Sequence, residues 1–196
     1  MSRKYHKRRR AELEQETRSR ITRALLRLHG TIGPARTTVR AVADEAGVQR
    51  ATVYRHFPDE PSMFAACSAH WAETNPLPDP AAWAQVAEPE RRLRGALDEL
   101  YAFYARNERL LANVFRDESL VERLSPSIQP LRDYLAGAAD VLARGLAKPR
   151  LTRAAIAHAL AFPTWRSLTR ENGLSRKQAA RLMAGMIAPA VRQPAR

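Results

Sequence analysis

One stretch constrains this 196-residue chain more than any other: Thr37 to Phe57, TTVRAVADEAGVQRATVYRHF. Apolar residues recur at helical spacing over 39–46, and Gly47 then stands where a helix must end and the backbone must turn sharply. The segment that follows, 49–56, is too short to form a stable helix alone. The pattern therefore predicts two short helices, joined by a tight turn and held against a scaffold.

The segment after the turn offers an unusually polar, basic and aromatic surface. Ala51 and Val53 are its candidates to face inward, and no acidic residue stands between Gln49 and Phe57. A recognition helix in a DNA major groove needs such a face, because phosphates and base edges require hydrogen-bond donors. Our DNA-binding candidates are all residues of 49–56 except Val53. They include Ala51 because it lies in the same short helix: Gln49, Arg50, Ala51, Thr52, Tyr54, Arg55 and His56.

The stretch contains the pattern Ala43-x-x-Ala46-Gly47-Val48-x-x-x-Thr52-x-Tyr54-x-His56-Phe57. This spacing resembles the helix-turn-helix of the tetracycline-repressor (TetR) family of bacterial transcription regulators. The resemblance implies an all-α fold, with an N-terminal three-helix DNA-binding head and a C-terminal helical bundle for ligand binding and dimerisation. It also implies that Arg40, on the helix before the turn, contacts DNA; a solvated arginine is the alternative.

The distribution of charge supports a polyanionic partner. The formal net charge is +13 and the sequence pI is about 11.0. Residues 1–57 hold 14 basic against 5 acidic residues, whereas residues 58–196 hold 19 against 15. A basic excess around the helix-turn-helix is the expected footprint of double-stranded DNA.

Targeting and redox features are sparse. The N-terminus, MSRKYHKRRR, has no apolar segment after its charges, and no apolar run is long enough to span a bilayer. Cys67 is the one cysteine, so an intrachain disulfide is impossible. We therefore expect a cytoplasmic protein without a membrane partner.

Composition shifts divide the chain into four parts. Residues 1–10 are predicted to be a basic, flexible arm that follows DNA, with a solvated tail as an equal alternative. Residues 11–74 form the helix-turn-helix domain with its connecting helix, and the proline-rich residues 75–80 form a linker. Residues 81–196 form a helical effector-binding and dimerisation domain.

The C-terminal part shows helical periodicity throughout. The pattern predicts a loop over Ser125–Pro130 and a helix over Thr152–Glu171, kinked or weakened at Pro163. The resemblance implies a homodimer through the last two long helices and an effector cavity. The candidates to line that cavity are the aromatic residues of this part and one histidine, and plain core packing is their alternative role: Tyr101, Tyr104, Phe115, Tyr134, His158, Phe162 and Trp165.

The resemblance thus implies a ligand-responsive transcriptional regulator, in the first place a repressor, that binds a palindromic operator as a homodimer and is released by a small molecule. Glu60 leaves an alternative open. The family usually has Lys or Arg at this position, where it contacts a DNA phosphate, whereas a glutamate would repel the phosphate. That alternative is a TetR-like protein with weakened DNA binding that acts through a protein partner. The sequence has no nucleophile–base pair, phosphate-binding glycine loop or metal cluster, so we expect no enzyme activity, cofactor or metal.

Overall fold

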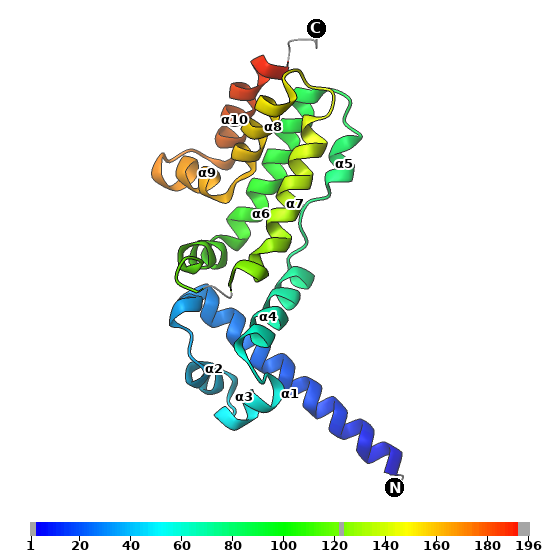
Figure 1. Ribbon diagram of the computed structural model, residues 1–196, viewed down its shortest axis with the longest axis vertical. Helices are drawn as coiled ribbons and strands as arrows, with labels where there is room; N and C mark the ends of the chain where they lie inside the picture. Colours follow the sequence, from blue (N-terminus) through cyan, green and yellow to red (C-terminus); the bar gives the residue numbers. More distant parts are fainter. Residues whose placement is uncertain (1–2, 122–123, 192–196) are drawn as a thin grey trace. The chain divides into compact units, whose positions relative to one another are not determined.

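The computed structural model describes residues 3–121 and 124–191, and every regular element within these ranges is a helix (Figure 1). The predicted all-α class is therefore confirmed for the described part of the chain. Residues 1–2 of the predicted arm and residues 192–196 of the predicted C-terminal domain lie outside the described residues.

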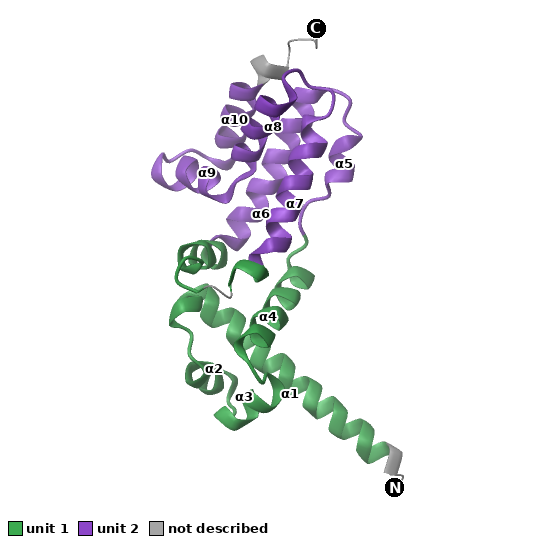
Figure 2. Ribbon diagram, viewed as in Figure 1, with its two compact units in different colours: residues 1–76, 109–127 green, residues 77–108, 128–196 purple. Residues whose placement is uncertain are grey.

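The helices follow one another as α1 (Arg3–Thr31), the 3₁₀ turn η1 (Pro34–Arg36), α2 (Val39–Ala46), α3 (Arg50–His56), α4 (Glu60–Thr74), α5 (Pro80–Ala84), α6 (Pro89–Asp117), α7 (Ser125–Ala143), α8 (Pro149–Leu160), α9 (Phe162–Arg166), the π-helical turn η3 (Ser167–Glu171) and α10 (Arg176–Val191). They form two compact units (Figure 2). Unit 1 holds residues 1–76 and 109–127, and unit 2 holds residues 77–108 and 128–196. Residues 109–127, which we expected in the C-terminal domain, thus group with the N-terminal unit.

The core of unit 1 is assembled from one face of each of its first four helices. The largest fully buried side chains in this core are Ile21 of α1, Val42 of α2, and Phe57 at the end of α3, each at most 1 % exposed. Burying such a side chain contributes about 1.5–3 kcal/mol. Cys67 of α4 joins them, and burial raises its pKa to about 12, so the thiol stays protonated.

Local signals in the sequence set the ends of several helices. The Thr38 side chain accepts a hydrogen bond from the Ala41 amide, and Asp59 accepts one from the Ser62 amide. Gly47 adopts the left-handed conformation, with φ 64° and ψ 42°, which costs glycine no steric strain. The turn at Gly47 was expected from the sequence, and the three features together fix where α2 begins, where α2 ends and where α4 begins.

Unit 2 is built around α6 and α7, with α8, α9 and α10 completing its core. Leu97, Leu100 and Leu142 are at most 1 % exposed, and so is Ile156. Ser175 and Gln178 cap α10 reciprocally: the Ser175 amide donates to Gln178 Oε1 at 2.9 Å, and the Gln178 amide donates to Ser175 Oγ at 3.3 Å.

The N-terminal basic segment is helical rather than a flexible arm from residue 3 on. The helix α1 begins at Arg3, and Arg8 and Arg10 lie four residues before Glu12 and Glu14, with which they form ion pairs at 2.9 and 3.3 Å. Such pairs support a helix weakly, by about 0.2–0.5 kcal/mol each. Leu13, although apolar, is 56 % exposed and does not belong to the core cluster of unit 1.

Two predictions around prolines were wrong in detail. The expected loop over Ser125–Pro130 is the first part of α7, which contains Pro130 within it. The expected helix over Thr152–Glu171 is not kinked but interrupted, because Ala161 is extended and Pro163 stands in the first turn of α9. Proline lacks an amide hydrogen and favours the start of a helix, so it separates two helices here.

The last turns of α6 hold the loop between α1 and α2 within unit 1. Asn113 Nδ2 donates to the His29 carbonyl at 2.9 Å, and the Ala35 amide donates to Asp117 Oδ2 at 3.0 Å. Asp117 is 2 % exposed and pairs with Arg116 at 2.7 Å. Burial by itself raises the pKa of a carboxyl group, but these hydrogen bonds and nearby arginine charges leave the pKa of Asp117 below its usual value. Asp117 therefore acts as a charged, buried acceptor.

We expect Asp117→Asn to lower the free energy of unfolding at pH 7 by about 2 kcal/mol, because hydrogen bonds to charged groups contribute about 1.5–3 kcal/mol. The folded pKa is depressed, so the wild-type stabilisation is present above the unfolded pKa of about 3.9 and is lost as the pH falls through the folded pKa. Urea unfolding at neutral and acidic pH measures both effects, with the exposed Glu16→Gln as control. A difference between wild type and variant that stays constant into acid would contradict this role.

Candidate nucleic-acid interface

The candidate interface is built on α3, whose inner face is fixed and whose outer face is open to solvent. Val53 is 0 % exposed, and Phe57, directly after the helix, is 1 % exposed. The turn that begins at Gly47 brings the chain from α2 directly into α3. Since a seven-residue helix is not stable alone, this packing is what holds the outer side chains in place.

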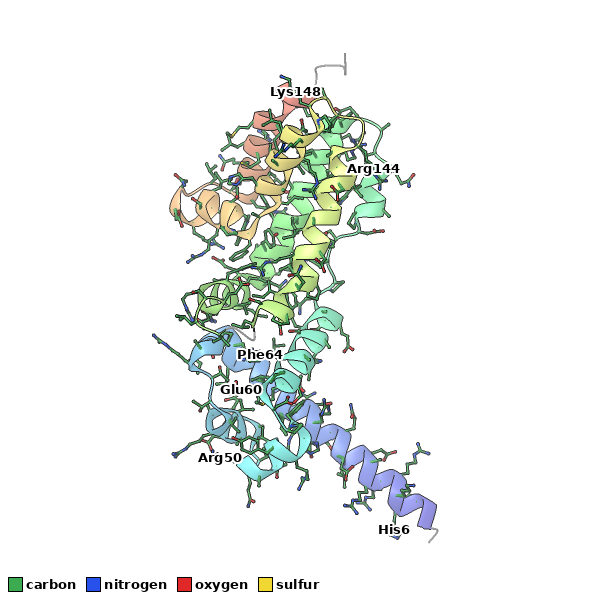
Figure 3. The ribbon with its side chains drawn as sticks, in the orientation of Figure 1. His6, Arg50, Glu60, Phe64, Arg144 and Lys148 are labelled. Atoms are coloured by element: carbon green, nitrogen blue, oxygen red, sulfur yellow. The ribbon has the colours of Figure 1, made fainter. Side chains whose placement is uncertain are left out.

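The outer face of α3 carries most of the predicted DNA-binding side chains. Arg50, labelled in Figure 3, is the first residue of the helix, and Tyr54 is 46 % exposed. Ala51 was expected to face inward, but it is exposed and stays with the outward set. Of the seven candidates within residues 49–56, Thr52 and His56 are partly buried. The other five are exposed: Gln49, Arg50, Ala51, Tyr54 and Arg55.

Arg40 extends the basic surface onto α2. Its Nε lies 3.8 Å from Asp44 Oδ2, and its side chain is 82 % exposed. An ion pair as open to solvent as this one contributes at most about 1 kcal/mol. Arg40 is therefore free to exchange Asp44 for a phosphate at little cost.

A cavity of about 540 Å³ adjoins this face within unit 1. Arg40, Arg50, Tyr54 and Glu60 line it together with apolar side chains of α1, α2 and α4. Glu60, also labelled in Figure 3, is the first residue of α4 and is exposed. The structure thus places this acidic side chain along the same depression as three of the basic or aromatic candidates.

His56 has a more internal position than the sequence suggested. Partial burial, followed by the charges of Arg55 and Arg18, lowers the pKa of His56 from its usual 6.5, so the ring is neutral at pH 7. Arg18 of α1 donates to the His56 carbonyl at 2.6 Å, and its guanidinium lies 4.2 Å from the centroid of the Phe57 ring. Sequence reasoning missed Arg18, because no local pattern indicates that α1 caps the end of α3.

Four candidates for the effector cavity form one closely packed cluster in unit 2. The centroid of the Tyr104 ring lies 5.4 Å from that of Phe162 and 5.8 Å from that of Trp165, and 6.4 Å from that of Tyr101. All four side chains are at most 3 % exposed. Burial raises the pKa of both tyrosines well above the usual value, so both hydroxyls are protonated.

The two tyrosine hydroxyls complete the interrupted end of α8. Tyr101 Oη donates to the Ala159 carbonyl at 2.8 Å, and Tyr104 Oη donates to the Leu160 carbonyl at 2.6 Å. In a continuous helix the Ala159 carbonyl would accept from residue 163, which is proline and has no amide hydrogen. These contacts give both tyrosines a structural role. By contrast, Trp165 Nε1 is buried without a hydrogen-bond partner among the described residues.

The other three effector-cavity candidates do not belong to this cluster. Tyr134 is partly buried and donates to the Pro78 carbonyl at 2.8 Å. His158 is exposed, and the Thr164 hydroxyl lies 3.5 Å from its Nε2. Phe115 lies in the part of α6 that belongs to unit 1.

Two further kinds of site are absent from the described residues. No cluster of His, Cys, Asp or Glu side chains in this part of the chain is arranged to hold a metal ion. Nor does the described part include a helix with the length and apolar character needed to cross a bilayer.

Comparison with known proteins adds a family resemblance in sequence for the first unit. Residues 21–67 match the family model described as bacterial regulatory proteins, tetR family. This segment runs from the middle of α1 through α2 and α3 into α4, and so contains the whole candidate interface on α2 and α3. No curated protein is significantly similar to the chain in sequence.

Solved structures resemble nearly the whole chain in fold. A TetR-like transcriptional regulator from Rhodococcus has a TM-score of 0.65 at 18 % identity, over 88 % of this chain and 93 % of that one. A TetR transcription regulator from Haloarcula marismortui has a TM-score of 0.63 at 19 % identity, over 91 % and 100 %. The TetR family regulator PfmR from Thermus thermophilus has a TM-score of 0.63 at 17 % identity, over 88 % and 99 %. The similarity in fold therefore extends through both units.

Proposed function

This chain belongs to the TetR family of bacterial transcription regulators through its helix-turn-helix, residues 21–67, and from that premise we propose that it is a homodimeric repressor which binds a palindromic DNA operator and is released by a small molecule. The observation that carries the proposal is the outer face of α3. It is basic and aromatic, lacks acidic residues, and is held rigidly by Val53 and Phe57. We place its action in the bacterial cytoplasm, where the DNA is.

The exposed side chains divide by chemistry into positioning and reading roles. Arg40, Arg55 and the Tyr54 hydroxyl suit phosphates, which fix the register of a protein on the duplex. Arg50 and Gln49, at the start of α3, suit base edges, where arginine can pair with guanine through two hydrogen bonds. DNA affinity would come mainly from the first group and sequence preference from the second.

An exposed apolar surface on α8 and α10 supports a second copy as partner. Leu182 and Met186 of α10 are 43 % and 68 % exposed, and Leu151 of α8 is 63 % exposed. Gly185, which is also exposed, lies between Leu182 and Met186 in the sequence of α10. Because glycine has no side chain, another helix can approach closely there. A two-fold operator needs a two-fold reader, with recognition helices about 34 Å apart.

The proposed effector acts through a difference in affinity between two states. A ligand can release DNA only if it binds the state with misplaced recognition helices more tightly than the DNA-binding state. The buried and unpartnered Nε1 of Trp165 is a hydrogen-bond donor that an effector within unit 2 can engage.

The test of this function is binding of fluorescent duplexes, including the promoter region of its own gene, measured by anisotropy at several salt concentrations. We expect the logarithm of the affinity to fall linearly with the logarithm of the salt concentration, as phosphate contacts require. Absence of binding to every duplex at low salt would exclude the proposal and favour the alternative, a regulator-like protein that acts through a protein partner.

Glu60 permits a sharper test of that alternative. If Glu60 faces a phosphate on bound DNA, Glu60→Lys should tighten binding about fivefold and steepen the salt dependence by about two units of slope, one for each half-site. Glu73→Lys makes the same charge change at an exposed position near the other end of α4 and is the control. Equal effects of the two variants would mean that Glu60 does not limit DNA binding.

A further inference from the structure

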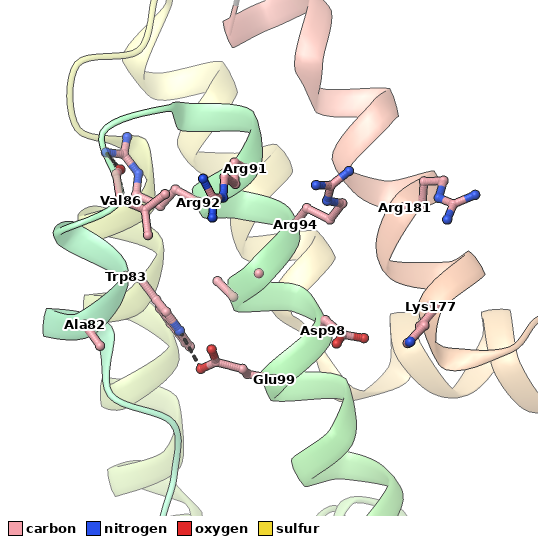
Figure 4. A pocket seen from close by; sticks show the side chains of 12 residues that line it. Ala82, Trp83, Val86, Arg91, Arg92, Arg94, Asp98, Glu99, Lys177 and Arg181 are labelled. Carbon is pink, nitrogen blue, oxygen red and sulfur yellow. Dashed lines mark hydrogen bonds between the residues drawn. The ribbon is translucent and has the colours of Figure 1, made fainter.

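A second depression, in unit 2, has no part in the functions proposed so far. It holds about 420 Å³ and is lined by residues of α5, α6 and α10 (Figure 4). Its uncharged lining residues are Ala82, Trp83, Val86, Gly95 and Ala96. Its charged lining is dominated by five cationic side chains against two acidic ones: Arg91, Arg92, Arg94, Lys177 and Arg181 against Asp98 and Glu99.

The two acidic side chains each have one described neighbour that carries a donor group. Glu99 Oε2 accepts a hydrogen bond from Trp83 Nε1 at 2.8 Å, drawn as a dashed line in Figure 4. Asp98 Oδ1 lies 3.6 Å from the Nε of Arg176, whose Nη1 also donates to the Asp98 carbonyl at 3.2 Å. The Trp83 hydrogen bond leaves the charge of Glu99 in place, and Asp98 Oδ1 is buried without a hydrogen-bond partner among the described residues. Five cationic side chains against two carboxylates still leave the lining with a formal excess of three positive charges.

One of the five cations has a structural role. Arg92 donates to the Val86 carbonyl at 3.4 Å and to the Arg144 carbonyl at 3.1 Å. Its Nε is buried without a hydrogen-bond partner among the described residues. Arg92 thus ties the segment after α5 to the end of α7 and keeps one donor unused.

The remaining four cations, Arg91, Arg94, Lys177 and Arg181, form no side-chain hydrogen bond or ion pair with another described residue. In Figure 4 the Arg94 side chain extends from α6 toward α10, which carries Lys177 and Arg181. Like charges that line one depression repel one another, over a screening length of about 8 Å at physiological salt. A bound anion would remove that repulsion.

We propose that this depression binds a small organic anion with at least two negative charges, carried by phosphate or carboxylate groups. Guanidinium groups match both anions through paired hydrogen bonds, and the volume lies within the range of about 300–1,000 Å³ typical of small-molecule sites. The site is separate from the aromatic cluster around Tyr104. The proposed anion binding is independent of the proposed DNA binding, which would stand even if no anion bound here.

Calorimetric titration of the full chain tests the site, with pyrophosphate as the phosphate probe and citrate as the carboxylate probe, both at constant ionic strength. At least one probe should bind one equivalent per chain. The double variant Arg94→Gln/Arg181→Gln should weaken that binding at least about tenfold, because each lost guanidinium removes a charge-assisted contact. Arg106→Gln/Arg166→Gln makes the same charge change at exposed positions of unit 2 outside the depression and should stay within about twofold of wild type.

Preference for pyrophosphate would identify a phosphate ligand, and preference for citrate a carboxylate ligand; either supports the site. Circular dichroism of the variants controls for folding, and Arg181→Gln alone serves if the double variant is unstable. Binding that is absent for both probes, or weakened equally in the two double variants, would overturn the proposal and leave only a solvated basic surface.

Discussion

Arg50→Ala is expected to weaken binding to the preferred operator by about 30-fold or more. Each good bidentate contact between arginine and a base contributes about 1–3 kcal/mol of discrimination, and a dimer would make the contact once in each half-site. A difference of about 1.4 kcal/mol changes an equilibrium tenfold. Since Arg50 is exposed at the start of α3, its removal leaves the core of unit 1 intact. Anisotropy titrations with the preferred duplex and with unrelated duplexes measure the effect.

The matched control is Tyr54→Ala, on the same face of α3. If Tyr54 contacts phosphates, its loss should weaken binding to all duplexes by a similar factor. Arg50→Ala should instead abolish the preference at one base pair in each half-site and change binding to unrelated DNA little. Equal losses on every duplex for both variants would contradict the assignment of Arg50 to a base edge.

Placing charges on the exposed apolar surface of α10 should weaken operator binding even more. Leu182→Arg/Met186→Arg is expected to convert the protein to monomers, because two opposed copies of the surface would bury like charges against each other. Operator affinity should then fall by about 10²- to 10⁴-fold, since the second half-site no longer benefits from being linked to the first. Sedimentation velocity gives the oligomeric state, and anisotropy gives the affinity.

Leu120→Arg is the control for that variant. Leu120 is 72 % exposed, in unit 1 and outside the last two helices, so its replacement adds a charge without touching the proposed dimer surface. It should leave the oligomeric state unchanged. A Leu182→Arg/Met186→Arg variant that remains dimeric would place the dimer contact elsewhere.

The parts of the fold that were predicted correctly depend on local signals. Gly47 was predicted to end a helix because of its backbone freedom, and the structure confirms it. Thr38, Asp59 and Ser175 likewise mark helix ends through their own side chains. Val53 was identified as inward-facing from helical spacing, and it is fully buried. The exposed positions of Arg50 and Tyr54 follow from the same spacing.

The parts that were missed depend on contacts between distant segments. The apolar character of Leu13 suggested burial, but whether a neighbour covers that turn of α1 is not encoded nearby. The ring of Tyr104 and its hydroxyl contact with α8 join residues 56 positions apart. Arg18 meets the His56 carbonyl across 38 positions. Periodicity within one helix carries no information on any of these contacts.

The same limit applies to the candidate effector residues. Aromatic residues in a helical bundle indicate a core or a cavity equally well, and only the contacts of Tyr101 and Tyr104 with the interrupted end of α8 give those two a structural role. The cationic depression between α6 and α10 brings together residues as distant in sequence as Arg94 and Arg181, 87 positions apart, and had no signal in the sequence pattern.

The proposed function requires that two copies of α3 read two related half-sites. Selection of bound duplexes from a random pool by the full-length protein tests it most directly. We expect enrichment of a palindromic consensus whose half-site centres lie about 34 Å apart, one turn of the double helix. A pool that shows no enrichment after repeated rounds, or one that yields a single unrepeated site, would contradict it.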